Sequence, residues 1–447
     1  MSNAPTVARI AFAAVVAGLL VAASGAFAQS NPSYIRLAPA AGALYRPDSG
    51  PAPHVGIIVM HRTANYLIHP ACTELSRRGF LVLCMNSRFA NNESQVRWEL
   101  IALDVKAGVD FLRRQPGITK VVLFGHSGGG PTMSFYQALA ENGSTYCRDP
   151  KRLVPCTEDF SELTRADGIV FADAHPGQPV MVMRALMPVA NEANPPNAPL
   201  IPELDPLNPQ NGYSASGVSH FSESFVSRYL EMQARRLNAI IDDAQARLTR
   251  IKEGAYPYAD DDIVIIPRAG NPGAGPYGTI YINQLDPGIA RMNHTVRPQK
   301  VLKNDGAIVS EIAKSVIVPD PTLPKEALSF GLGTKVLTLR SFMSANAVRA
   351  TNSADGIDHC TSNNSTTCAI QSISVPVLFA GMGAFVFVRD NEVFYELSKS
   401  LDKELIYIEG ANHGFTGCKP CETVPGQYQN SFRNFFDYVA KWIDARF

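Results

Sequence analysis

Short apolar runs alternate with segments of helical periodicity over the first part of the chain. The runs Val55–Met60 and Val82–Met85 are typical of buried strands. Between Glu99 and Arg114 apolar residues recur at helical spacing, and Gln115-Pro116-Gly117 ends that predicted helix. Another strand is predicted at Val121–Phe124. Strands and helices that alternate in this way predict a mostly parallel sheet with helices on both faces.

The same pattern continues beyond a glycine-rich turn. A helix is predicted from about 131 to 141, followed by a strand at Gly168–Ala172. It resumes much later in the chain, where we predict four elements: a strand at Val375–Ala380, a helix at Asn391–Leu401, a strand at Glu404–Glu409 and a helix at Tyr428–Arg446. The residues 29–177 and 372–447 are therefore predicted to form one α/β core.

A different composition separates the two core segments. Residues 190–216 are rich in proline and asparagine, which is typical of a long connection rather than an ordinary loop. A long amphipathic helix is predicted at Ser222–Lys252. Strand-like runs follow at 263–267, 279–282 and 335–339. We interpret residues 178–371 as a mixed α/β cap inserted between two consecutive core strands.

The first 28 residues have the pattern of a secretory signal peptide. The cation Arg9 precedes the apolar stretch Ile10–Ala23, and the small residues Ala26 and Ala28 form an A-x-A cleavage site. A membrane anchor is the alternative, but a spanning helix needs about 20 apolar residues. The sequence thus predicts export to the periplasm or the extracellular space, without stable membrane insertion.

The eight cysteines fall into four close couples, as expected for local disulfide bonds in an oxidising compartment. The couples are Cys72 with Cys84, Cys147 with Cys156, Cys360 with Cys368, and Cys418 with Cys421. For the first couple, a helix running down the sheet and a strand returning up it would leave both sulfurs near one edge. Buried free thiols are the alternative.

The charge balance and the remaining motifs exclude several function classes. The chain has 40 basic and 40 acidic residues, so it lacks the excess cation that nucleic acids or anionic membranes attract. A small-molecule or polymeric uncharged partner is predicted, and the oligomeric state stays open. Gly273–Gly278 matches a dinucleotide fingerprint in letters, but no helix follows it. Asp260–Asp262 is typical of a solvated turn, with a cation site as the alternative. We expect no cofactor.

The stretch Gly125-His126-Ser127-Gly128-Gly129 contains the strongest chemical signal. It satisfies G-x-S-x-G and lies between a predicted strand and a predicted helix, which is the context of a nucleophilic serine on a tight turn. A serine hydroxyl needs a neighbouring base to attack a carbonyl. Among nine histidines, His413 follows a predicted core strand near the end of the chain and is the candidate base. His126 is expected to point away from the nucleophile.

With these motifs the sequence resembles the α/β-hydrolase superfamily of serine esterases and lipases. The resemblance covers residues 29–177 and 372–447 and depends on "GALYRPDSG…HVGIIVMHRT", "VVLFGHSGGG" and "YIEGANHGF". It implies an α/β-hydrolase fold and an oxyanion hole formed by the backbone N–H groups of Gly128 and Thr63. The family usually has glycine where Arg62 stands. Arg62 could therefore meet a substrate carboxylate or form a surface ion pair.

The third triad member departs from the usual family position. The family commonly places an aspartate in G-x-x-D after the seventh strand, where this chain has Ala384. Some lipases place the acid after the sixth strand instead, and Asp173 stands there. Asp390 and Glu392 are the alternatives, although Asp390 also suits the N-cap of the predicted helix that follows it.

Together these patterns predict a secreted serine hydrolase that cleaves carboxylic esters through Ser127, His413 and Asp173. An amidase, a lactonase or an acyltransferase would use the same acyl-enzyme. A catalytically silent binding protein on the same scaffold is also open, because position 384 lacks the acid. The inserted cap is expected to cover the mouth of the site, with a dimerisation surface or a purely stabilising role as alternatives.

Overall fold

The computed structural model describes residues 31–189, 201–269, 282–286, 288–289, 294–316 and 333–447. The predicted signal peptide, residues 190–200 of the proline-rich connection, the 273–278 motif and residues 279–281 lie outside this part of the chain. Ile282, the last residue of the strand predicted there, instead begins helix α6 (Ile282–Leu285).

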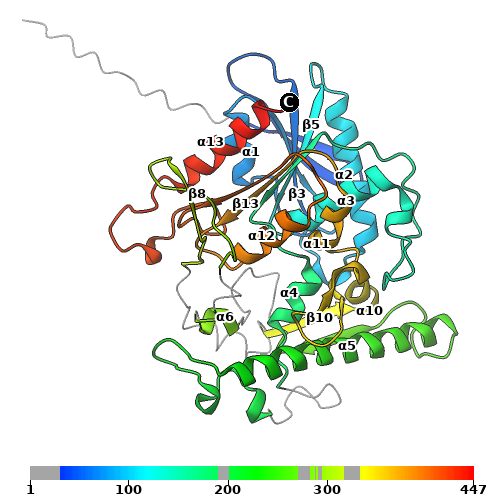
Figure 1. Cartoon of the computed structure of the whole chain (residues 1–447). Coiled ribbons are helices and arrows are strands. Elements are labelled where there is room, and N and C mark those ends of the chain that lie inside the picture. The colour runs from blue at the N-terminus through cyan, green and yellow to red at the C-terminus, as the bar shows by residue number, and fades with distance from the viewer. Residues whose placement is uncertain (1–30, 190–200, 270–281, 287, 290–293, 317–332) are drawn as a thin grey trace, which may run out of the picture.

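A ten-stranded sheet forms the centre of the described chain (Figure 1). Its strands lie in the order β1 (Ser33–Leu37), β2 (Ala40–Tyr45), β4 (Leu81–Asn86), β3 (Val55–His61), β5 (Lys120–His126), β6 (Gly168–Ala172), β13 (Val377–Met382), β14 (Lys403–Ile408), β8 (Gln299–Leu302) and β9 (Ile308–Glu311). The strands from β4 to β8 run parallel, and β1, β2 and β9 pair antiparallel at the two edges.

Helices cover both faces of this sheet. On one face pack α1 (Pro70–Ser76) and α13 (Ser431–Asp444), and on the other α2 (Trp98–Arg113), α3 (Gly129–Asn142) and α12 (Val388–Leu397). Alternate residues of β3 enter different cores: Ile57 and Val59 pack with α1 and α13, whereas Ile58 and Met60 pack with α2 and α3. The β3 strand is buried on both faces, which is why its sequence is continuously apolar. The parallel sheet with helices on both faces confirms the predicted fold class.

The segment between β6 and β13 contains a further core. The predicted long helix is confirmed as α5 (Glu223–Lys252), which begins where the Ser222 side chain accepts the N–H of Phe225. With α5 lie α4 (Gln178–Ala185) and the pair β7 (Ile263–Pro267) and β10 (Thr334–Thr338). Short elements complete this segment: α10 (Leu339–Ser341), a π-helix (Phe342–Asn346), β11 (Arg349–Ala350), β12 (Ile357–Asp358) and α11 (Thr366–Ala369).

In Figure 1, α5 runs along the foot of the molecule, with α4 between it and the sheet. The proposed division into a core and a cap at residues 178 and 371 stays a prediction. Within the predicted insertion, β8 and β9 extend the main sheet beside β14. These strands are short and partly exposed, so the sequence pattern around them is weak.

The cysteines pair as the sequence predicts, with all four couples at disulfide-bond distance. Cys72 lies on α1 and Cys84 on β4, so the bond fastens a helix to the strand that follows it. Within the part of the chain that the structure describes, no helix is long and apolar enough to cross a membrane.

Candidate active site

Ser127 lies on a sharp turn between β5 and α3. Its φ is +55°, a conformation that costs a non-glycine residue about 1–3 kcal/mol and is held only where the surroundings enforce it. Glycines on either side make the turn possible. A Cβ atom on Gly125 would lie 2.6 Å from the carbonyl oxygen of Gly129, and one on Gly129 would lie 2.6 Å from that of Met60. The glycine-rich motif is therefore a steric requirement of the turn that presents Ser127.

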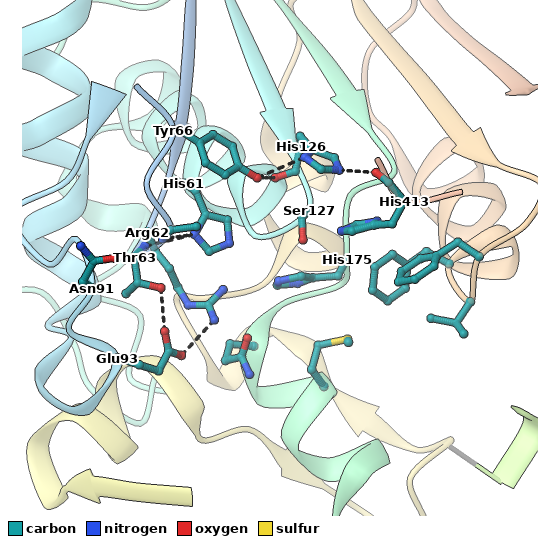
Figure 2. Close-up of a pocket in the computed structure, with 16 residues that line it drawn as sticks. His61, Arg62, Thr63, Tyr66, Asn91, Glu93, His126, Ser127, His175 and His413 are labelled. Atoms are coloured by element: carbon teal, nitrogen blue, oxygen red, sulfur yellow. Dashed lines mark hydrogen bonds and ion pairs between the residues drawn. The ribbon is translucent and has the colours of Figure 1, made fainter. Parts of the chain in front are cut away.

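The Ser127 side chain faces a cavity of about 420 Å³ at the carboxyl end of the parallel strands (Figure 2). His413, from the loop after β14, and His175, from the loop after β6, face the same cavity. Arg62 and Thr63 line it from the loop after β3. Open α/β sheets bind ligands at this edge because the loops after successive parallel strands meet there.

His413 and Asp173 form a direct hydrogen bond. The His413 Nδ1 atom lies 2.6 Å from Asp173 Oδ2. The Asp173 side chain is fully buried, and its other oxygen accepts the N–H of Met382 at 3.2 Å. The structure thus brings together the acid and the base that the sequence nominates, from loops 240 residues apart.

Burial shifts the pKa values of both members of this pair. It lowers the pKa of His413 to about 3, which favours the neutral imidazole. Burial also raises the pKa of Asp173 well above its ordinary value, an effect that the Met382 N–H opposes. A neutral His413 whose Nδ1 hydrogen is held by Asp173 has a lone pair on Nε2. No hydrogen bond joins Ser127 to His413 among the described residues, and such catalytic bonds often tighten only in the substrate complex.

The two alternative acids lie in other contacts. Asp390 accepts hydrogen bonds from both terminal nitrogens of Arg184, at 2.8 and 2.9 Å. Glu392 accepts the backbone N–H groups of Val296 and Arg297. The predicted N-cap role of Asp390 is wrong, because α12 begins at Val388 and Asp390 lies in its first turn.

The loop after β3 departs from the expected oxyanion geometry. The Thr63 N–H donates to His61 Nδ1 at 3.1 Å, and the Ala64 N–H donates to the same atom at 2.9 Å. The Thr63 hydroxyl donates to Glu93 at 2.7 Å. The proposed Thr63 donor is therefore engaged within the loop, whereas Gly128 directly follows Ser127 at the start of α3.

The order of strands and the placement of the site residues decide the fold. A serine on a strained turn after β5 is followed along the chain by an aspartate after β6 and a histidine after β14, which is the order of the hydrolase motif. The chain has the α/β-hydrolase fold. This assignment depends on topology and local geometry.

Comparisons with known proteins find the chain similar to several solved structures. They include the monoacylglycerol lipase of Paleococcus ferrophilus (12% identity, 91% of this chain and 98% of that chain, TM-score 0.37). A soluble variant of the monoglyceride lipase of Saccharomyces cerevisiae aligns at 11% identity over 93% and 94% of the two chains, with a TM-score of 0.40. The alpha/beta hydrolase GrgF from a Penicillium species aligns at 11% identity over 93% and 96%, with a TM-score of 0.41. No family model and no curated protein matches the chain.

The cavity is also lined by His175, a histidine that the sequence analysis does not single out. His175 is buried, and its Nδ1 atom accepts the Gly177 N–H at 3.1 Å. The remaining hydrogen is thus on Nε2, on the side of the ring that faces the cavity (Figure 2). Burial, together with the nearby Arg62 guanidinium, keeps the pKa of His175 well below its ordinary value. The sequence feature that could have identified His175 is its position two residues after Asp173, at the carboxyl end of a parallel strand.

Two hydrogen-bonded imidazoles, those of His69 and His126, contact the loop that carries His413. His69 Nδ1 accepts the Ala71 N–H, so its Nε2 donates to His126 Nδ1 at 2.9 Å. The other ring nitrogen of His126 donates to the His413 carbonyl oxygen at 2.8 Å. His126 is therefore a positioning residue for the His413 loop, and its side chain is turned away from Ser127.

Replacing His126 with phenylalanine is expected to lower kcat about 10- to 100-fold, because the loop that carries His413 loses a buried tether and small misplacements of reacting groups are costly. KM for a short ester should stay within about threefold of the wild-type value. The measurement is steady-state kinetics on folded protein. His126→Gln, whose amide can still donate, should recover part of kcat, and the exposed His54→Phe serves as the control. Equal kcat for wild type and His126→Phe would contradict the role.

Proposed function

We propose that the protein is a serine hydrolase that cleaves carboxylic esters through an acyl-enzyme. Ser127 Oγ attacks the ester carbonyl carbon while His413 Nε2 takes the hydroxyl proton, and the carbonyl electron pair moves onto the oxygen. The C–O bond to the alcohol then breaks, and the alcohol leaves with the proton from His413. Water repeats the sequence on the acyl-enzyme, releasing the acid and restoring Ser127.

One observation carries this proposal: Ser127, on a strained positive-φ turn, shares a cavity with the imidazole of His413, whose Nδ1 is bonded to a buried Asp173. In the proposed mechanism Asp173 fixes the tautomer of His413 and stabilises the imidazolium that forms during acyl transfer. The Gly128 N–H, at the start of α3, stabilises the oxyanion. Thr63 contributes a second N–H only if its bond to His61 opens.

The substrate in this proposal is a small-molecule or polymeric ester, and every step above uses groups of this chain alone. We also propose that the protein is exported. The four disulfide-distance cysteine couples support this, since such bonds persist in oxidising compartments.

Labelling by a fluorophosphonate combined with product analysis tests the proposal. We expect the folded mature protein to react with the probe and to release acid from a panel of short-chain, aromatic and polymeric esters. Amides and lactones of matched structure are the comparison, and added alcohols reveal acyl transfer. Failure of folded protein to react with the probe or any ester would favour a binding protein on the hydrolase scaffold.

A further inference from the structure

Three charged side chains form a buried cluster beside the cavity. Arg62 donates to Glu93 at 2.9 Å, and Lys335 Nζ lies 3.7 Å from the same carboxylate oxygen. The exposed fractions of the Arg62 and Lys335 side chains are 3% and 4%, and that of Glu93 is 20%. Burial lowers the pKa of Lys335 to about 8, so it remains mostly protonated at neutral pH. The cluster therefore holds two cations against one carboxylate.

The Arg62 guanidinium has donors that no residue satisfies. Its Nη2 binds Glu93, whereas its buried Nε has no partner, and Nη1 has none among the described residues. Arg62 lines the same cavity as Ser127, and its side chain is directed toward it in Figure 2. Gly128 provides the space for this arrangement, because a Cβ atom there would lie 2.4 Å from Arg62 Nη1.

Two other lining groups direct donors into this cavity or leave donors without a partner. The buried Gln178 Nε2 lines it without a partner, and His175 has its hydrogen on the nitrogen that faces it. Glu93 is the carboxylate among the described lining residues, and it already accepts a hydrogen bond from Arg62. Unsatisfied buried donors are costly, and an uncompensated buried cation is more so. The cluster thus carries one positive charge in excess, and buried donors of Arg62 and Gln178 have no acceptor.

We propose that the substrate ester carries a free carboxylate, which Arg62 binds inside the cavity next to Ser127. This inference rests on the proposed ester hydrolysis. A substrate carboxylate balances the second cation and satisfies donors that would otherwise stay unpaired. An oxyanion contact alone is a poorer explanation, because it appears only transiently, whereas the excess charge is permanent.

Matched pairs of substrates test the inference. Half-esters of C3 to C6 dicarboxylic acids provide a carboxylate on the acyl side, and acetylated ω-hydroxy acids provide one on the alcohol side. Each has an uncharged counterpart in which the carboxylate is a carboxamide. We expect the wild type to prefer the carboxylate member of at least one pair by about 10- to 100-fold in kcat/KM, the range of a hydrogen bond to a charged group. Arg62→Met should remove this preference, so that the ratio of kcat/KM between the two members of a pair falls to about one.

Two further variants keep the result interpretable. Arg62→Met combined with Glu93→Gln avoids leaving Glu93 without its arginine and should show the same lost preference. Arg88→Met, which removes an arginine paired to a buried carboxylate outside the cavity, should keep it. Absence of a preference in every pair, or a preference that persists in Arg62→Met, overturns the inference. So does an equal loss of kcat on both members of a pair, which would make Arg62 an oxyanion donor.

A binding measurement separates this inference from the proposed function. With Ser127→Ala, the free dicarboxylate is expected to bind more tightly than its half-amide by a similar factor in calorimetry, and Arg62→Met should abolish the difference. If the wild type cleaves esters through Ser127 but neither assay discriminates charge, only the carboxylate site is wrong. If it cleaves no ester and takes no fluorophosphonate, the proposed function falls and the inference with it.

Discussion

Ser127→Ala is expected to reduce turnover of short p-nitrophenyl esters by about 10⁴- to 10⁶-fold in kcat. The reason is that no other hydroxyl occupies the positive-φ turn between β5 and α3, so the acyl-enzyme cannot form. Steady-state kinetics and fluorophosphonate labelling measure the effect, and both should be lost together.

The variant should remain folded, because alanine carries the same Cβ atom and meets the same backbone conformation as serine. Its thermal unfolding midpoint is therefore expected to match that of the wild type. Ser134→Ala is a suitable control, since this buried serine on α3 donates only to the nearby carbonyl of Pro131. Persisting turnover in folded Ser127→Ala would show that Ser127 is not the nucleophile.

The core of the fold could be predicted from the sequence because its signals are local. Strands such as β3 are buried on both faces and are continuously apolar, and the helices between them have clear periodicity. Gly125 and Gly129 mark the turn at Ser127 because nothing larger fits beside the neighbouring backbone. The fold prediction was confirmed for this reason.

Features that depend on distant pairings could not be predicted in the same way. The cluster of Arg62, Glu93 and Lys335 joins two core loops to β10, and sequence spacing does not reveal that proximity. Arg62 forms an ion pair, which was one of its two expected roles, but its side chain is buried rather than at the surface. The bond between the Thr63 N–H and His61 likewise depends on the local path of a loop.

The choice of triad acid shows the same limit. The sequence favours Asp173, which follows the sixth core strand, and leaves Asp390 and Glu392 as alternatives. The structure separates their contacts: Asp173 meets His413, whereas Asp390 meets Arg184 and Glu392 meets backbone N–H groups. The catalytic role of Asp173 stays a prediction that kinetics can test.

Asp173→Asn is expected to lower kcat by about 10³- to 10⁴-fold at neutral pH. An asparagine amide that turns its N–H₂ group toward His413 Nδ1 favours the tautomer with hydrogen on Nε2, which cannot accept the Ser127 proton. It also removes the charge that stabilises the imidazolium. The measurement is kcat and KM for the same ester, with KM expected to change much less than kcat because the acid does not touch the substrate.

Asp390→Asn and Glu392→Gln provide the discriminating controls. Both remove a buried carboxylate that anchors α12 or the segment near Val296, so each should lower the unfolding midpoint while keeping kcat within about tenfold of the wild type. Loss of kcat by three orders of magnitude in either of them, with Asp173→Asn still active, would transfer the acid role to that residue. A double variant with Ser127→Ala adds a check, because residues of one triad are strongly non-additive. Asp173→Asn should therefore cause almost no further loss once Ser127 is gone.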